Sequence, residues 1–193
     1  MSIKTSNPIP NEIGSNGGIG TYDDMLGAVS AARVPASSAP TWTNITLDGF
    51  TTQALAFGVG DYIDIFVQTS HSVQLNQVIE NHIHWTISSD DDGDEFQFQI
   101  TGVGAGIGDS FSSIGTIKSG DVTLQTGDSG KHNLLEIGDI PALNTTVSSV
   151  YIIRLQRIAV DDGNETARDI FVLFNDSHPL IDTMGSLKEG SKV

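Results

Sequence analysis

The segment VIENHIHWTI, residues 78–87, contains the residues of this 193-residue chain whose types and spacing best suit chemistry. It places His82 and His84 two residues apart, and side chains at positions i and i+2 of a β-strand point to the same face. Such a pair of imidazoles can bind a divalent metal ion, transfer protons in catalysis, or form hydrogen bonds in a half-buried sheet. The choice among these roles separates an enzyme from a structural protein.

A metal centre is one alternative, because jelly-roll oxygenases of the cupin type use a His-x-His strand together with a Glu and a third His. This sequence departs from that pattern, since the next Glu is Glu95, beyond an Asp-rich turn. His71 or His178 could supply a third imidazole, but nothing in the spacing requires it. The sequence therefore favours a structural role for the imidazoles, and we expect no bound metal and no cofactor.

Other catalytic motifs are missing from the sequence. The chain has no Cys, which excludes a thiolate nucleophile and a thiolate metal site. The glycine-rich segment TGVGAGIGDS (101–110) lacks the Lys of a P-loop, so it is expected to be a flexible loop between strands. No GxSxG motif of a nucleophile elbow occurs either. We expect no catalytic residues and no enzymatic activity.

The elements that must position the histidines are predicted from alternation of apolar and polar residues. Ile83, Trp85 and Ile87 form one face of the His-x-His strand, and Phe96, Phe98 and Ile100 form one face of the next. Further strands are expected in residues 62–68, 121–125, 132–137, 150–158 and 169–176, separated by Gly/Asp turns. This pattern predicts an all-β fold, an antiparallel jelly-roll sandwich with an extended N-terminal arm.

Two regions are expected along the chain. Residues 1–42 form an extended N-terminal arm with one short helix, from Tyr22 to Ala32. Residues 1–20 carry too little apolar surface to fold alone and are expected to order only against a partner. Residues 43–193 form the jelly-roll sandwich domain and a short C-terminal tail.

Composition excludes some partners. With 24 acidic and 9 basic residues the net charge is −15, which repels phosphate backbones and disfavours nucleic-acid binding. No apolar run approaches the roughly 20 residues that a membrane helix needs, so no membrane association is expected. The first residues lack the apolar core of a signal peptide, so the protein is expected to be made in the cytoplasm.

Three segments together resemble a family of structural virion proteins of tailed bacteriophages. They are RVPASSAPTW (33–42), VQTSHSVQLNQVIENHIHW (67–85) and FNDSHPLIDTMGS (174–186), which contain an HxHW strand and an FxDxH…DxxGS motif. Phe174, Asp176 and His178 keep the family pattern, whereas Pro179 replaces the usual aromatic residue and is expected to end its strand early. The resemblance covers residues 21–186.

The resemblance implies a homotrimeric component of the virion, made in the host cytoplasm. The favoured role is a capsid decoration (cement) protein that stabilises contacts between subunits of the major capsid protein. A tail, fibre or receptor-binding component is one alternative, and a cupin-like metalloenzyme is another. The residues expected at contacts between subunits are His71, His82, His84, Gln97, Gln99 and His178.

Overall fold

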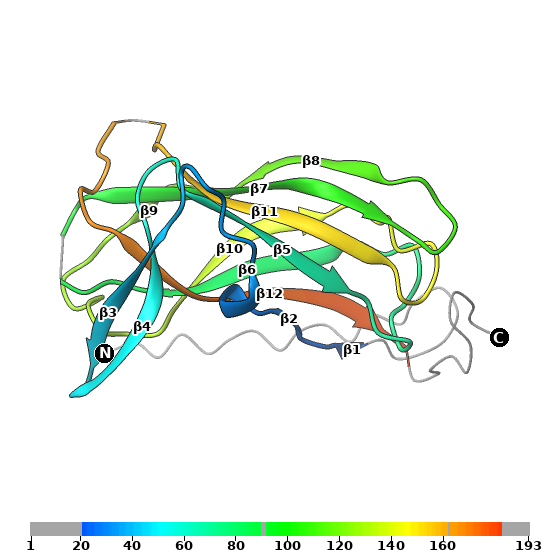
Figure 1. The fold of residues 1–193 in the computed structure, drawn as a ribbon, viewed down its shortest axis with the longest axis horizontal. Coiled ribbons are helices and arrows are strands. Elements are labelled where there is room, and N and C mark those ends of the chain that lie inside the picture. The colour runs from blue at the N-terminus through cyan, green and yellow to red at the C-terminus, as the bar shows by residue number, and fades with distance from the viewer. Residues whose placement is uncertain (1–20, 90–91, 162, 183–193) are drawn as a thin grey trace, which may run out of the picture.

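The computed structural model describes residues 21–89, 92–161 and 163–182, and it consists of two antiparallel β-sheets packed face to face (Figure 1). The first sheet has the strand order β10 (Asn133–Ile140), β6 (Ile79–Thr86), β12 (Ile170–Ile181), β4 (Phe50–Phe57) and β3 (Thr41–Leu47). The short strands β1 (Thr21–Tyr22) and β2 (Met25–Gly27) also pair with β12. The second sheet has the order β5 (Tyr62–Gln68), β11 (Val150–Ile158), β7 (Glu95–Ala105) and β8 (Ser112–Lys118), with β9 (Val122–Thr123) beside β7.

The strand order is that of a jelly roll. The sequence β4-β12-β6-β10 in one sheet faces β5-β11-β7-β8 in the other, and most consecutive strands cross from one sheet to the other. Two Greek keys wound in this way form the eight-stranded jelly-roll sandwich. The predicted fold class is therefore confirmed, whereas residues 1–20 of the predicted arm lie outside the described residues.

The core between the sheets contains the apolar faces that the alternation predicts. Ile83 and Trp85 of β6 and Phe96 and Phe98 of β7 are all buried in it. An aromatic contact connects the two sheets: the rings of Trp85 in the first sheet and Phe96 in the second pack edge to face, with their centroids 4.8 Å apart. Since Ile83 and Trp85 point inward, His82 and His84 belong to the outer face of the first sheet.

The helix expected from Tyr22 to Ala32 is not formed, which corrects the sequence-based prediction. β1 and β2 occupy this segment instead, followed by a single 3-10 turn, Val29–Ala31. The physical reason is that β4 pairs with β12 only from Ile170 to Val172, so the rest of this edge of β12 needs another strand to satisfy its backbone hydrogen bonds.

No helix in the described parts of the chain is long and apolar enough to cross a membrane.

β12 does not end early at Pro179, which is a second correction. The strand continues to Ile181, with Pro179 opposite Ile79 of β6. Pro179 has no N–H to donate, but its carbonyl oxygen accepts a hydrogen bond from the backbone N–H of Asp23. The link between β1 and β2 therefore stabilises the strand at the position where the sequence suggests a break.

The glycine-rich segment 101–110 is not simply a loop, because β7 continues through it to Ala105. Gly102 lies where a Cβ would collide with the carbonyl oxygen of Ile152 on β11, and a Cβ at Gly104 would lie 2.7 Å from the Tyr151 ring. The glycines therefore allow β7 to lie close to β11 and its buried tyrosine.

The Gly102→Ala substitution is expected to lower the free energy of unfolding by about 1–3 kcal/mol, because β7 and β11 must separate to accept the methyl group. Urea denaturation followed by circular dichroism measures this change. Gly120→Ala is the matched control, since a Cβ at Gly120 meets nothing within 4 Å. Equal stability of the two variants would contradict the close-approach explanation.

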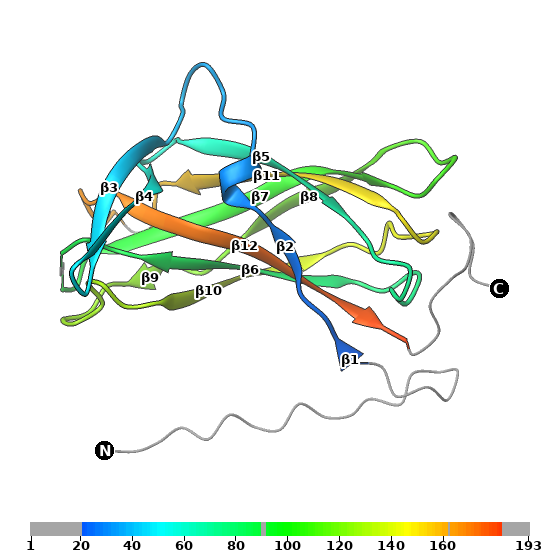
Figure 2. The same cartoon turned by 60° about the horizontal axis from the view of Figure 1, so that its bottom comes forward.

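The β3–β4 hairpin lies at one end of the sandwich (Figure 2), and its tip extends past the sheets in Figure 1. Its two-residue turn, Asp48 and Gly49, has positive φ angles of 47° and 81°, as a type I′ turn requires. Phe50 follows the turn and is the most exposed large apolar side chain among the described residues, with 70% of its surface accessible. The hairpin thus presents an aromatic ring to solvent at its tip.

Candidate functional site

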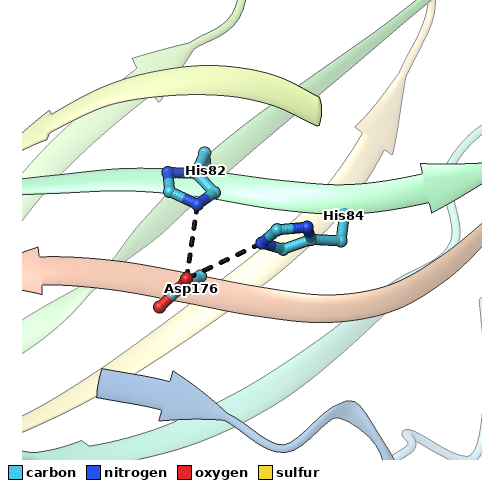
Figure 3. A group of neighbouring side chains, drawn as sticks. All are labelled: His82, His84 and Asp176. Atoms are coloured by element: carbon cyan, nitrogen blue, oxygen red, sulfur yellow. Dashed lines mark ion pairs between the residues drawn. The ribbon is translucent and has the colours of Figure 1, made fainter. Parts of the chain in front are cut away.

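The outer face of the first sheet carries a cluster of histidines around one aspartate. Antiparallel pairing of β6 with β12 places His82 opposite Asp176 and His84 opposite Phe174. Because side chains alternate along β12, Asp176 and His178 point to the same outer face as the two histidines of β6. Figure 3 shows His82 and His84 on one strand, with Asp176 facing them from the neighbouring strand.

Three imidazoles converge on a single carboxylate oxygen. The Oδ2 atom of Asp176 lies 3.4 Å from Nε2 of His82, 3.6 Å from Nε2 of His84 and 3.1 Å from Nε2 of His178. The His178 Nε2 also lies 2.9 Å from Oδ1 of Asp24, in the link between β1 and β2. The cluster therefore joins β6, β12 and the N-terminal segment through one shared carboxylate.

Two members of the cluster are buried and two are partly open to solvent. His82 is 7% exposed and Asp176 is 3% exposed, whereas His84 and His178 are half-buried. Burial lowers the pKa of His82, and the neighbouring imidazole of His178 lowers that pKa further, while Asp176 acts in the opposite direction. His82 is thus held toward its neutral form, in which a ring nitrogen is available as a ligand or hydrogen-bond acceptor.

His132 and a surface depression lie next to these residues. The Nδ1 atom of His84 lies 2.6 Å from Nε2 of His132, which comes just before β10. A depression of about 350 Å³ opens beside them, and its walls are formed by Asp24, His84, His132, Leu173, Phe174 and Asp176. This arrangement can bind a cation or a small polar group, because acidic and imidazole groups meet at the edge of the depression.

The other predicted contact residues lie elsewhere. His71 is in the loop between β5 and β6, where its Nε2 lies 3.0 Å from the Ser148 hydroxyl. Gln97 and Gln99 lie on β7, on the outer face of the second sheet, which is opposite the His cluster. Gln97 is buried and donates to the carbonyl of Ser119, and Gln99 donates to Gln156. The structure therefore brings together His82, His84 and His178 but separates them from the two glutamines.

Sequence reasoning missed Asp176, Asp24 and His132 as members of the cluster. Asp176 and His178 follow the same i, i+2 spacing as His82 and His84, and this repeated alternation was the available signal. Nothing comparable indicated His132 or Asp24, because their positions depend on pairing between strands distant in the sequence.

The fold and the site together define an all-β jelly-roll protein with a His/Asp cluster on the outer face of one sheet. No protein-family model matches the chain, and no curated protein shows significant sequence similarity to it. Its function must therefore be argued from its own surface.

Proposed function

We propose that this protein is a structural component of a bacteriophage virion, a capsid decoration protein that acts as a homotrimer without enzymatic activity. The observation that carries the proposal is the meeting of the two sequence segments that resemble phage virion proteins. His82 and His84 of the HxHW strand lie beside Phe174, Asp176 and His178 of the C-terminal motif, although about 90 residues separate them in sequence. Residues that define the resemblance thus share one surface.

Apolar side chains flank this surface as in a contact between subunits. Phe174, His84 and Leu134 lie in one row across β12, β6 and β10. Phe174 is 48% exposed and Leu134 is 53% exposed, on a face where an isolated domain normally carries charged residues. A second copy of the chain would cover these side chains, and a closed ring of copies would do so without open-ended growth.

Light scattering of the purified protein at micromolar concentration tests the assembly. The wild-type mass is expected to be about three times 20.5 kDa. Replacing both Phe174 and Leu134 by Ser is expected to yield the monomer, because the substitutions remove the apolar contact without disturbing buried residues. Phe111→Ser, in the exposed loop between β7 and β8, serves as the control and should keep the trimer mass. A monomeric wild-type protein would contradict the trimer.

Electron microscopy of the phage particle tests the virion assignment itself. Many copies at junctions between capsid subunits are the expected result for a decoration protein. A few copies at the tail would replace this assignment with a tail or fibre component, and absence from the particle would refute both. The exposed Phe50 at the tip of the β3–β4 hairpin suits contact with a larger virion protein.

A further inference from the structure

We propose that His82, His84, His178 and Asp176 bind one divalent transition-metal ion per chain, with Zn²⁺ as the best-suited ion. The inference goes beyond the virion role and does not depend on it. It rests on the positions of four potential ligand atoms and on the groups that surround them.

The distances from Asp176 Oδ2 to three imidazole nitrogens match the edge of a tetrahedral site. With metal–ligand bonds of about 2.0–2.1 Å, neighbouring ligand atoms of a tetrahedron lie about 3.3–3.5 Å apart. Three Nε2 atoms lie 3.1–3.6 Å from Oδ2 of Asp176, close to this tetrahedral edge. His82, His84 and Asp176 also have their ligand atoms within 4.8 Å of one another. His178 belongs to a second group of this kind, with Asp24 and Asp176, so its ring must turn from Asp24 toward His82 and His84 to complete a four-ligand set.

Hydrogen bonding alone explains this geometry poorly. The separations of Asp176 Oδ2 from the rings of His82 and His84 are 3.4 and 3.6 Å, longer than the 2.7–3.2 Å typical of N–H···O bonds. The other oxygen, Oδ1, is buried without a hydrogen-bond partner among the described residues. Only His178 lies within hydrogen-bonding distance of Oδ2, so a cation shared between the carboxylate and the rings of His82 and His84 accounts for their longer separations.

His132 supplies the outer support that metal-binding histidines usually have. If Nε2 of His84 binds the metal, the proton of that ring resides on Nδ1. That Nδ1 lies 2.6 Å from Nε2 of His132, which can accept the hydrogen bond and fix the ring in place. A partner of this kind orients the ligand and strengthens metal binding.

The surrounding charges also favour a cation. Pairing places Glu136 of β10 opposite His82 and Glu80 of β6 opposite His178, and both carboxylates are exposed. Asp24 approaches His178 from the link between β1 and β2. Three imidazoles and one carboxylate match the preference of zinc for nitrogen and oxygen ligands.

The location indicates a structural role for the metal. The cluster lies on the outer face of the first sheet and joins β6, β12 and the N-terminal segment, whereas the space between the sheets is filled by apolar side chains. Four protein ligands leave no open position for a substrate in a tetrahedral site. The ion would thus fasten β6 to β12, the two strands that supply its ligands.

Zinc binding to the full-length protein, stripped of metal with a chelator, tests the inference. Isothermal titration with ZnCl₂ and elemental analysis after dialysis are expected to give one Zn²⁺ per chain, and the melting temperature should rise with zinc concentration. Added Co²⁺ should give the intense visible absorption of a tetrahedral site. Because stoichiometry is counted per chain, the result is separate from the oligomer mass.

Variants graded by position make the test specific. His84→Ala and Asp176→Asn should lose stoichiometric zinc, and His132→Ala should bind it about 10- to 100-fold more weakly. His71→Gln, outside the cluster, should bind zinc like the wild type. Far-UV circular dichroism verifies that each variant folds. If Asp176→Asn does not fold, His84→Ala alone tests the proposal, because His84 is only half-buried and its replacement disturbs the core less. Absence of zinc binding by the wild type, or unchanged binding by a folded His84→Ala variant, would overturn the proposal.

Discussion

Replacing Trp85 by Ala is expected to lower the free energy of unfolding by about 3–5 kcal/mol. The side chain is 3% exposed and lies between the two sheets, where its ring packs edge to face against Phe96. Removing it leaves a cavity that the strands cannot fill by moving, because both sheets are fixed by hydrogen bonding on either side. Urea denaturation at one fixed protein concentration, followed by circular dichroism, measures the loss.

Two further substitutions separate cavity formation from loss of the indole N–H. The Nε1 atom of Trp85 is buried without a hydrogen-bond partner in the described part of the chain, so Trp85→Phe removes an unpaired donor while keeping an aromatic ring. Its cost is expected to stay below about 1.5 kcal/mol. Trp42→Ala, at a half-exposed ring on β3, should cost about 0.5 kcal/mol or less. Equal losses at Trp42 and Trp85 would contradict the core assignment.

The fold was predictable because the alternation of apolar and polar residues along each strand can be seen within a short segment of the sequence. Each of the segments HIHWTI and EFQFQI specifies which of its residues face the core, and the buried residues of β6 and β7 agree with that pattern. The predicted helix from Tyr22 to Ala32 failed because a short segment gains little from helix formation alone. The uncovered edge of β12 offers that segment backbone hydrogen bonds, and this edge exists only after distant strands have paired.

The candidate site was predictable only in part, for the same reason. The pair His82 and His84 is visible as a spacing within one strand, whereas Asp176 joins them through the register of β6 with β12. His132 reaches His84 from the segment before β10. Strand register follows from the packing of the whole sandwich and not from local spacing, so the members contributed by other strands could not be read from the sequence.

Arg157 is a buried charge whose role also depends on the folded chain. Its side chain is 1% exposed, at the end of β11. The guanidinium donates to the carbonyl oxygens of Phe57, Arg168 and Thr166 and forms an ion pair of 2.6 Å with Glu165. These contacts tie the end of β4 to the loop between β11 and β12. A planar group with several donors suits this arrangement better than the single ammonium group of a Lys.

The Arg157→Ala substitution is expected to lower the free energy of unfolding by about 3–5 kcal/mol, because it leaves Glu165 and the buried carbonyl oxygens without their donor. Arg154→Ala, on the same strand, is the matched control. Arg154 forms a two-bond ion pair with Asp64 and stacks on Tyr62, but its side chain is 44% exposed, so its loss should cost about 1 kcal/mol or less. Added salt should weaken the contribution of Arg154 more than that of Arg157, since water and ions screen only the exposed pair effectively. Comparable losses for the two variants in urea denaturation, or an equal response to salt, would show that Arg157 is not the buried anchor that its contacts indicate.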